Sequence, residues 1–256
     1  MSKPQKNQEL DTKPGTGVAV VDQMPDFLRD KQGSARGREN VGAEDLVIPR
    51  LEIVQDLSPA RKKSDPNYIE GAEEGMLYNN VTRELYGQSV VVIPVGYVKE
   101  WLLWKDRKKG GGFGGAFPNE QDAKRAIDLL EDADDWAAID TGQQFCVLVK
   151  PDGSLEEIVV SMAKSKAKVS RKWNSLIRIA NADSFARAYK LSAVQDQNKN
   201  NEKFYNFGVA PAGFPTESAY VKAERMYKAF MEGRVSASRD AEDEGESGGH
   251  SGGREY

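Results

Sequence analysis

The feature that most constrains the fold is a run of fifteen residues, Val90 to Trp104, that reads VVVIPVGYVKEWLLW. Valine, isoleucine, tyrosine and tryptophan are enriched in β-strands because their branched or flat side chains pack well on a pleated surface. Pro94 and Gly96 lie inside the run, and a proline in a helix interior removes a hydrogen bond and clashes with the preceding turn. The run therefore predicts one long strand with a bulge or a bend at Pro94–Gly96.

Two hairpins are expected after this strand. The first pairs residues 145–150 with 155–161 across Pro151-Asp152-Gly153-Ser154, whose Asp-Gly pair is typical of tight hairpin turns. The second pairs residues 184–194 with 203–209 across a longer polar loop. Shorter extended segments are expected before the long strand, at residues 43–57 (where Pro49 argues against a helix), 76–78 and 85–86.

Three helices are expected from apolar spacing and from helix start signals. Asn119 can cap a short acidic helix that reaches about Leu130, and Pro215 precedes a helix over 216–231. Residues 164–180 carry an apolar stripe around Trp173, with a basic opposite face. This order predicts a mainly β domain with helices (α+β), namely an OB-like antiparallel β-barrel with a helix between its third and fourth main strands and a C-terminal helix. Other antiparallel α+β sheets with the same order remain open.

Composition divides the chain into three parts. Hydrophobic residues make up 39% of the sequence, charged residues 30%, and the mean hydropathy is -0.64, so a modest core is expected beside a sizeable disordered fraction. Residues 1–40 predict a disordered N-terminal arm, 41–232 a single OB-like domain with an insertion at about 106–142, and 233–256 a disordered acidic tail.

The chemistry available for catalysis is narrow. Cys146 and His250 are the only cysteine and the only histidine, which excludes Cys/His zinc sites, Cys-His dyads and Ser-His-Asp triads. Pro151-Asp152 with Glu156 resembles the start of a metal-dependent nuclease motif, but the lysine that this motif needs on the next strand is missing, and the hairpin turn explains Asp152. The chain is therefore expected not to be an enzyme and to use no cofactor and no metal.

The net charge of -4 hides a strong separation of charge. Residues 161–203 hold ten basic and three acidic side chains, a net +7, and a second basic group surrounds Arg107. Residues 120–140 hold eight acidic and two basic side chains. A phosphate backbone is a common partner for such a basic surface, because each neutralised phosphate releases a counterion.

Aromatic side chains alternate with these bases on the expected strands. Flat rings can stack on bases while cations follow the phosphates, which is the pattern that single-stranded nucleic acid requires. The same rings can instead belong to the core of the domain. The residues expected to bind DNA are Lys99, Trp101, Lys105, Arg107, Lys108, Lys109, Lys166, Lys168, Arg171, Lys172, Arg187, Tyr189, Lys190, Lys203 and Tyr205.

The acidic tail can be a solubilising segment or a functional one. In the functional interpretation it occupies the basic surface when DNA is absent and recruits replication or recombination proteins when DNA is bound. The residues expected to bind partners are Asp240, Glu242, Asp243, Glu244, Glu246 and Tyr256.

Several segments between about 43 and 210 resemble a group of bacteriophage-encoded proteins. They are AEDLVIPRL at 43–51, GMLYN at 75–79, VIPV at 92–95, WLLW at 101–104, SMA at 161–163, WNSL at 173–176 and FARAYKL at 185–191. The layout of a barrel-like body with an acidic tail is also similar to phage single-stranded-DNA-binding proteins of the OB-fold type, although this tail is interrupted by Gly and Ser and ends in Tyr rather than Phe.

The resemblance implies a single-stranded-DNA-binding protein of phage DNA replication or recombination, acting in the cytoplasm of the infected bacterial host. A phage structural or assembly protein is the alternative, and a metal-dependent nuclease a more distant one. No segment approaches the apolar length of a membrane span, so no membrane partner is expected, whereas self-association into a homo-oligomer is left open.

Overall fold

The computed structural model describes Gly37 and residues 48–198 and 200–233. The chain divides after Val41 into two units, and the second, which begins at Gly42, contains every described residue except Gly37. The expected N-terminal arm (apart from Gly37) and the expected acidic tail after Gly233 lie outside the described residues, as do the six tail residues expected to bind partners.

A large antiparallel sheet organises the domain, and Val90–Trp104 forms most of its central strand as predicted. Its strands run in the order β7-β6-β4-β8-β9, and β5 pairs with the far end of β4. They are β4 (Ser89–Lys105), β5 (Phe113–Phe117), β6 (Trp136–Val149), β7 (Leu155–Ala163), β8 (Ala188–Gln197) and β9 (Lys203–Gly213). Both predicted hairpins, β6–β7 and β8–β9, are present.

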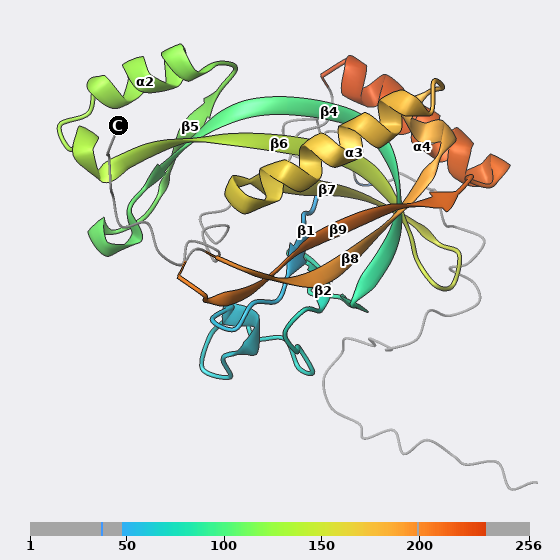
Figure 1. The fold of residues 1–256 in the computed structure, drawn as a ribbon, viewed down its shortest axis with the longest axis horizontal. Helices are drawn as coiled ribbons and strands as arrows, with labels where there is room; N and C mark the ends of the chain where they lie inside the picture. Colours follow the sequence, from blue (N-terminus) through green and yellow to red (C-terminus); the bar gives the residue numbers. More distant parts are fainter. Residues whose placement is uncertain (1–36, 38–47, 199, 234–256) are drawn as a thin grey trace, which may run out of the picture. The chain divides into compact units, whose positions relative to one another are not determined.

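The predicted irregularity in β4 falls between Pro94 and Gly96, where the register with β6 shifts. A side chain on Gly96 would lie 2.7 Å from the Phe230 ring, so glycine allows that ring to pack against the strand. Before this bulge β4 pairs with both β6 and β8; beyond it β4 continues with β6 and then β5. We call residues 99–142 the arm; in Figure 1 it carries α2 and extends away from α3 and α4.

A smaller sheet and the helices complete the domain. The small sheet has the antiparallel order β1-β2-β3. Its strands are β1 (Leu51–Ile53), β2 (Leu77–Asn79) and β3 (Leu85–Gly87). The described α-helices are α2 (Glu120–Asp128), α3 (Ala167–Ile179) and α4 (Glu217–Met231). The 3-10 turns are η2 (Pro59–Arg61), η3 (Arg107–Lys109), η4 (Ala133–Asp135), η5 (Lys164–Lys166) and η6 (Ser184–Ala186). Asn119 caps α2 as predicted, accepting a hydrogen bond from the Asp122 N–H at 2.9 Å.

Two cores lie on opposite faces of the large sheet. On the α3 face, Trp173 of α3 packs with Tyr189 of β8, ring centroids 5.9 Å apart, together with apolar residues of the small sheet. On the α4 face, Ala223 and other residues of α4 cover β4 and β6. Cys146, the single thiol, is fully buried in the first core, and burial raises its pKa.

The two outer strands of the large sheet do not pair with each other, so the sheet is not closed into a barrel. Instead, the segment that contains β1 reaches both edges. At the β7 edge, the Val159 N–H donates to the Pro49 carbonyl at 2.8 Å. At the β9 edge, the Gln55 amide donates to the Tyr205 carbonyl at 2.7 Å and accepts from the Tyr205 N–H at 2.8 Å. The mainly β, α+β prediction is confirmed, whereas strand-to-strand barrel closure is not found.

We expect Gln55→Ala to lower the free energy of unfolding by about 2–4 kcal/mol, because both main-chain groups of Tyr205 lose their partner in a mostly buried place. Urea unfolding and amide hydrogen exchange at Tyr205 would measure the effect. Gln88→Ala, at an exposed position, is the control and should stay within about 0.5 kcal/mol of the native protein. Unchanged exchange at Tyr205 would contradict this account of the edge.

Candidate nucleic-acid interface

The outer side of α3 carries four of the chain's basic residues without acidic partners. Lys168, Arg171, Lys172 and Arg178 are all exposed, and none makes a side-chain ion pair or hydrogen bond within the described part of the chain. Trp173 points the opposite way and is buried. The amphipathic pattern predicted for residues 164–180 is therefore confirmed, and we call these four residues the α3 cations.

An exposed aromatic ring lies beside the inner flank of α3. The hydroxyl groups of Tyr97 and Ser170 each lie 2.9 Å from the point where a side chain on Gly142 would begin, so both approach Gly142 closely because it has no side chain. The Tyr97 side chain is 40% exposed. Lys99 and Trp101 follow Tyr97 on the same face of β4, because alternate residues of a strand share a face.

Most of the arm's basic residues are paired with acidic residues of the same arm, which the sequence did not reveal. Lys99 lies 3.1 Å from Asp140, and Lys109 lies 3.6 Å from Asp135. Lys105 forms an ion pair with Asp132 and lies 5.8 Å from the centroid of the Trp136 ring. The hydrogen bond between Lys105 and Asp132 raises the pKa of the lysine and lowers that of the aspartate. Lys108 is exposed, and the side chain of Arg107 lies outside the described part.

Two of the residues expected to bind DNA are buried, which removes them from any accessible surface. Lys166 is 7% exposed, and its ammonium lies 5.2 Å from the centroid of the Phe207 ring. Tyr189 is 1% exposed, because its side of β8 faces Trp173. The expectation that these two contact DNA is therefore corrected: strand alternation and helical spacing place them among the core residues.

The remaining candidates lie on β8, on β9 or just before β8. Lys190 and Lys203 are exposed, whereas Tyr205 is partly buried against the core of the α3 face. Arg187 is also partly buried, and its guanidinium lies 5.4 Å from the centroid of the Phe214 ring. Phe214 is 75% exposed and was not among the sequence candidates, because no alternation pattern marks a single aromatic residue after a strand.

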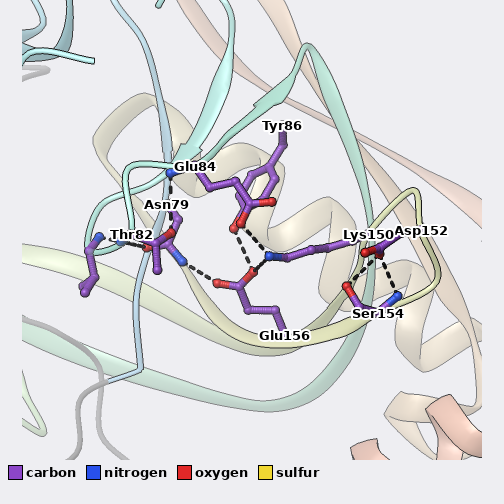
Figure 2. A network of polar contacts seen from close by, with 9 residues as sticks. Asn79, Thr82, Glu84, Tyr86, Lys150, Asp152, Ser154 and Glu156 are labelled. Carbon is purple, nitrogen blue, oxygen red and sulfur yellow. Dashed lines mark hydrogen bonds and ion pairs between the residues drawn. The ribbon is translucent and has the colours of Figure 1, made fainter. Parts of the chain in front are cut away.

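The residues that resemble a nuclease motif have structural partners (Figure 2). Asp152 accepts hydrogen bonds from the N–H of Ser154 at 2.9 Å and from its hydroxyl at 2.7 Å, so it supports the turn between β6 and β7. Lys150 lies 2.5 Å from Glu84 and 2.9 Å from Glu156. Within residues 48–198 and 200–233, no three His, Cys, Asp or Glu side chains are grouped so that they could hold a metal ion.

Glu156 extends this network to the small sheet. It accepts hydrogen bonds from the Asn79 amide at 2.5 Å and from the Tyr86 hydroxyl at 3.0 Å. The network therefore joins β2 and β3 to the β6–β7 hairpin. The hydrogen bonds from Lys150 to Glu84 and Glu156 raise the pKa of Lys150, and burial raises the pKa of Tyr86.

Comparison with known proteins identifies the family of the chain. The sequence model of a family described as Pam3 phage gp34-like protein matches residues 15–236, which is most of the chain. The chain belongs to this gp34-like family. The family description indicates a bacteriophage origin, in agreement with the phage part of the predicted resemblance. No curated protein and no solved structure matches the chain.

The match covers all the elements that form the gp34-like fold described above, including the arm and α3. Among the described helices, none is both long enough and apolar enough to cross a membrane.

We expect Lys150→Met to lower the free energy of unfolding by about 1–3 kcal/mol near neutral pH, because two carboxylates lose their shared cation in a partly buried place. The raised pKa of Lys150 means that its contribution is complete below about pH 10 and is lost as pH rises through the folded-state value. Ionisation of Tyr86, whose pKa is also raised, destabilises the fold in the same alkaline range.

Urea unfolding of the native protein and of Lys150→Met at about pH 8 and about pH 11 would test the size of the Lys150 contribution and its loss with rising pH. The difference between the two proteins should shrink at the higher pH. Lys124→Met removes an exposed ion pair with Glu120 and should change stability by no more than about 0.5 kcal/mol. A difference that stays constant with pH would show that the network does not act through the charge of Lys150.

Proposed function

We propose that this gp34-like protein binds single-stranded DNA, without catalysis, during phage DNA replication or recombination. The α3 cations neutralise phosphates, and the aromatic side chains at the base of the arm, Tyr97 and Trp101, stack on bases. The observation that carries the proposal is a set of four exposed, unpaired cations on one helix next to an exposed ring.

The arrangement of charge on α3 costs stability unless an anion is bound. Like charges three or four residues apart on a helix repel by about 0.2–0.5 kcal/mol per pair, and Lys168, Arg171 and Lys172 have this spacing. The sequence holds more acidic than basic residues, but the carboxylates near the arm pair with its lysines, and the positive charge of α3 stays without an acidic partner. A polyanion that lies along α3 supplies the missing counter-charge.

The fold supports the proposal through its strand order. Taken in chain order, β4, β6, β7, β8 and β9 are first to fifth, the sheet order is third-second-first-fourth-fifth, and α3 lies between the third and fourth strands. We infer an OB-like barrel that stays open between β7 and β9, and OB-folds, which are only partly closed, commonly bind oligonucleotides. Since α4 packs against the other face of β4 and β6, bases would meet β4 at the exposed Tyr97, which lies on the α3 side beside Ser170.

We expect the double variant Arg171→Gln/Lys172→Gln to weaken binding to oligo-dT and to lower the log–log salt slope by about 0.7 for each phosphate that is no longer neutralised. Lys124→Gln/Arg125→Gln is the matched control: it also removes one lysine and one arginine from adjacent helix positions, but both are paired with acids of α2. Fluorescence anisotropy at two salt concentrations would compare the two variants with the native protein.

Two outcomes would contradict the proposal. An equal loss of affinity in both double variants would mean that net charge, and not the α3 surface, governs binding. Equal or tighter binding to duplex DNA of the same length would favour a phage structural or assembly role.

The tail extends the proposal to regulation and partners. Residues 240–256 contain six carboxylates and one arginine, and such a segment can compete with DNA for the α3 cations and recruit replication or recombination proteins. We expect deletion of residues 240–256 to tighten binding to oligo-dT, most clearly at low salt, where charges are least screened.

A tail of unchanged length, with its Asp and Glu residues replaced by Asn and Gln, should have the same effect as the deletion. If both altered proteins bind oligo-dT with the native affinity at low salt, the tail does not compete for the DNA surface.

A further inference from the structure

Phe214 is an exposed aromatic residue that the fold holds in place. Its side chain is 75% exposed, and it lies in the short connection between β9, which ends at Gly213, and α4, which begins at Glu217. Gly213 adopts a φ of +104°, a backbone conformation that other residues rarely adopt, and Pro215 follows directly. Pro215 therefore restricts the backbone at Phe214, because the residue before a proline favours extended conformations.

One side of the ring has a cationic neighbour. The guanidinium of Arg187, just before β8, lies 5.4 Å from the Phe214 ring centroid, a distance at which a cation is attracted to an aromatic ring. Arg187 is partly buried, so it loses little further conformational freedom by staying there. The nearby aromatic side chains are used differently: Phe185 is buried and packs against Tyr220, ring centroids 5.0 Å apart, and against Tyr227 at 5.6 Å. Phe214 takes part in none of these ring pairs.

We propose that Phe214 is a stacking platform for a nucleobase of the bound strand, with Arg187 holding the ring and contributing positive charge beside it. This inference rests on the proposed binding of single-stranded DNA and adds a contact outside the α3 surface. A base has a flat face that can lie on an exposed ring, and such stacking tolerates every sequence.

An oligonucleotide without bases separates stacking from phosphate binding. We would measure the affinity of the full chain for oligo-dT and for an abasic oligonucleotide of the same length, using the native protein, Phe214→Ala and Phe214→Tyr. Phe214→Ala should weaken oligo-dT binding at least about fivefold, the usual loss for one stacked base, and leave abasic binding unchanged. Phe214→Tyr keeps a flat ring and should bind oligo-dT with nearly native affinity.

Leu129→Ala is the control for loss of exposed apolar surface, because Leu129 is 86% exposed at the end of α2. It should bind both oligonucleotides as the native protein does. Melting curves should coincide for all variants, since neither exposed side chain belongs to a core.

Two results would overturn the inference. If Phe214→Ala binds oligo-dT with native affinity, the ring does not stack on DNA; if it weakens both oligonucleotides equally, Phe214 acts only by positioning Arg187 on a phosphate. Failure of the proposed function looks different: the native protein would then bind neither oligonucleotide, or Arg171→Gln/Lys172→Gln would match its control.

Discussion

The side-chain amide of Gln55 takes the place of a strand that the sheet lacks. A primary amide offers one carbonyl and N–H donors, so it can satisfy both main-chain groups of one residue in an edge strand. On β9 that residue is Tyr205, while the same segment of chain uses its own main chain at Pro49 to reach β7. Unpaired main-chain groups at a buried edge would cost free energy, and they would also offer a template for pairing with other chains. Because this segment spans the gap, it also places Leu51 and Ile53 in the core that Trp173 fills from the other side.

The distribution of charge follows from which residues meet in space. The acidic cluster at 120–140 and the basic group before Gly110 are separate in the sequence, but they occupy the two sides of one arm. Their ion pairs are exposed or partly exposed, so each adds little stability, but together they leave the arm with few free cations. Consequently the only helix with a run of unmatched positive charge in the described part is α3. A polyanion would therefore be drawn to α3 rather than to the arm.

Much of the fold could be predicted from local signals. The run from Val90 to Trp104, the Asp152-Gly153 turn and the cap at Asn119 each depend on residues that are close in sequence, and each has its counterpart in the structure. The strand β5 could not be recognised, because Phe113–Phe117 contains two glycines and shows no alternation. The first part of β6, from Trp136, could not be recognised either, because it is a strand through its pairing with β4 and not through its own composition. The site was harder, because alternation shows that Tyr189 and Lys190 point in opposite directions without showing which direction is inward.

The burial of Cys146 has a practical consequence for studying how the domain opens. The thiol lies on the central part of β6 with no exposed surface, and its raised pKa keeps it protonated and unreactive at neutral pH. A thiol reagent can reach it only while β6 is separated from its covering layer, so the labelling rate reports that opening directly. Because the sequence has no other cysteine, the signal comes from one atom in the centre of the sheet. A cysteine introduced on the surface would, in turn, accept a dye without competition from the native thiol.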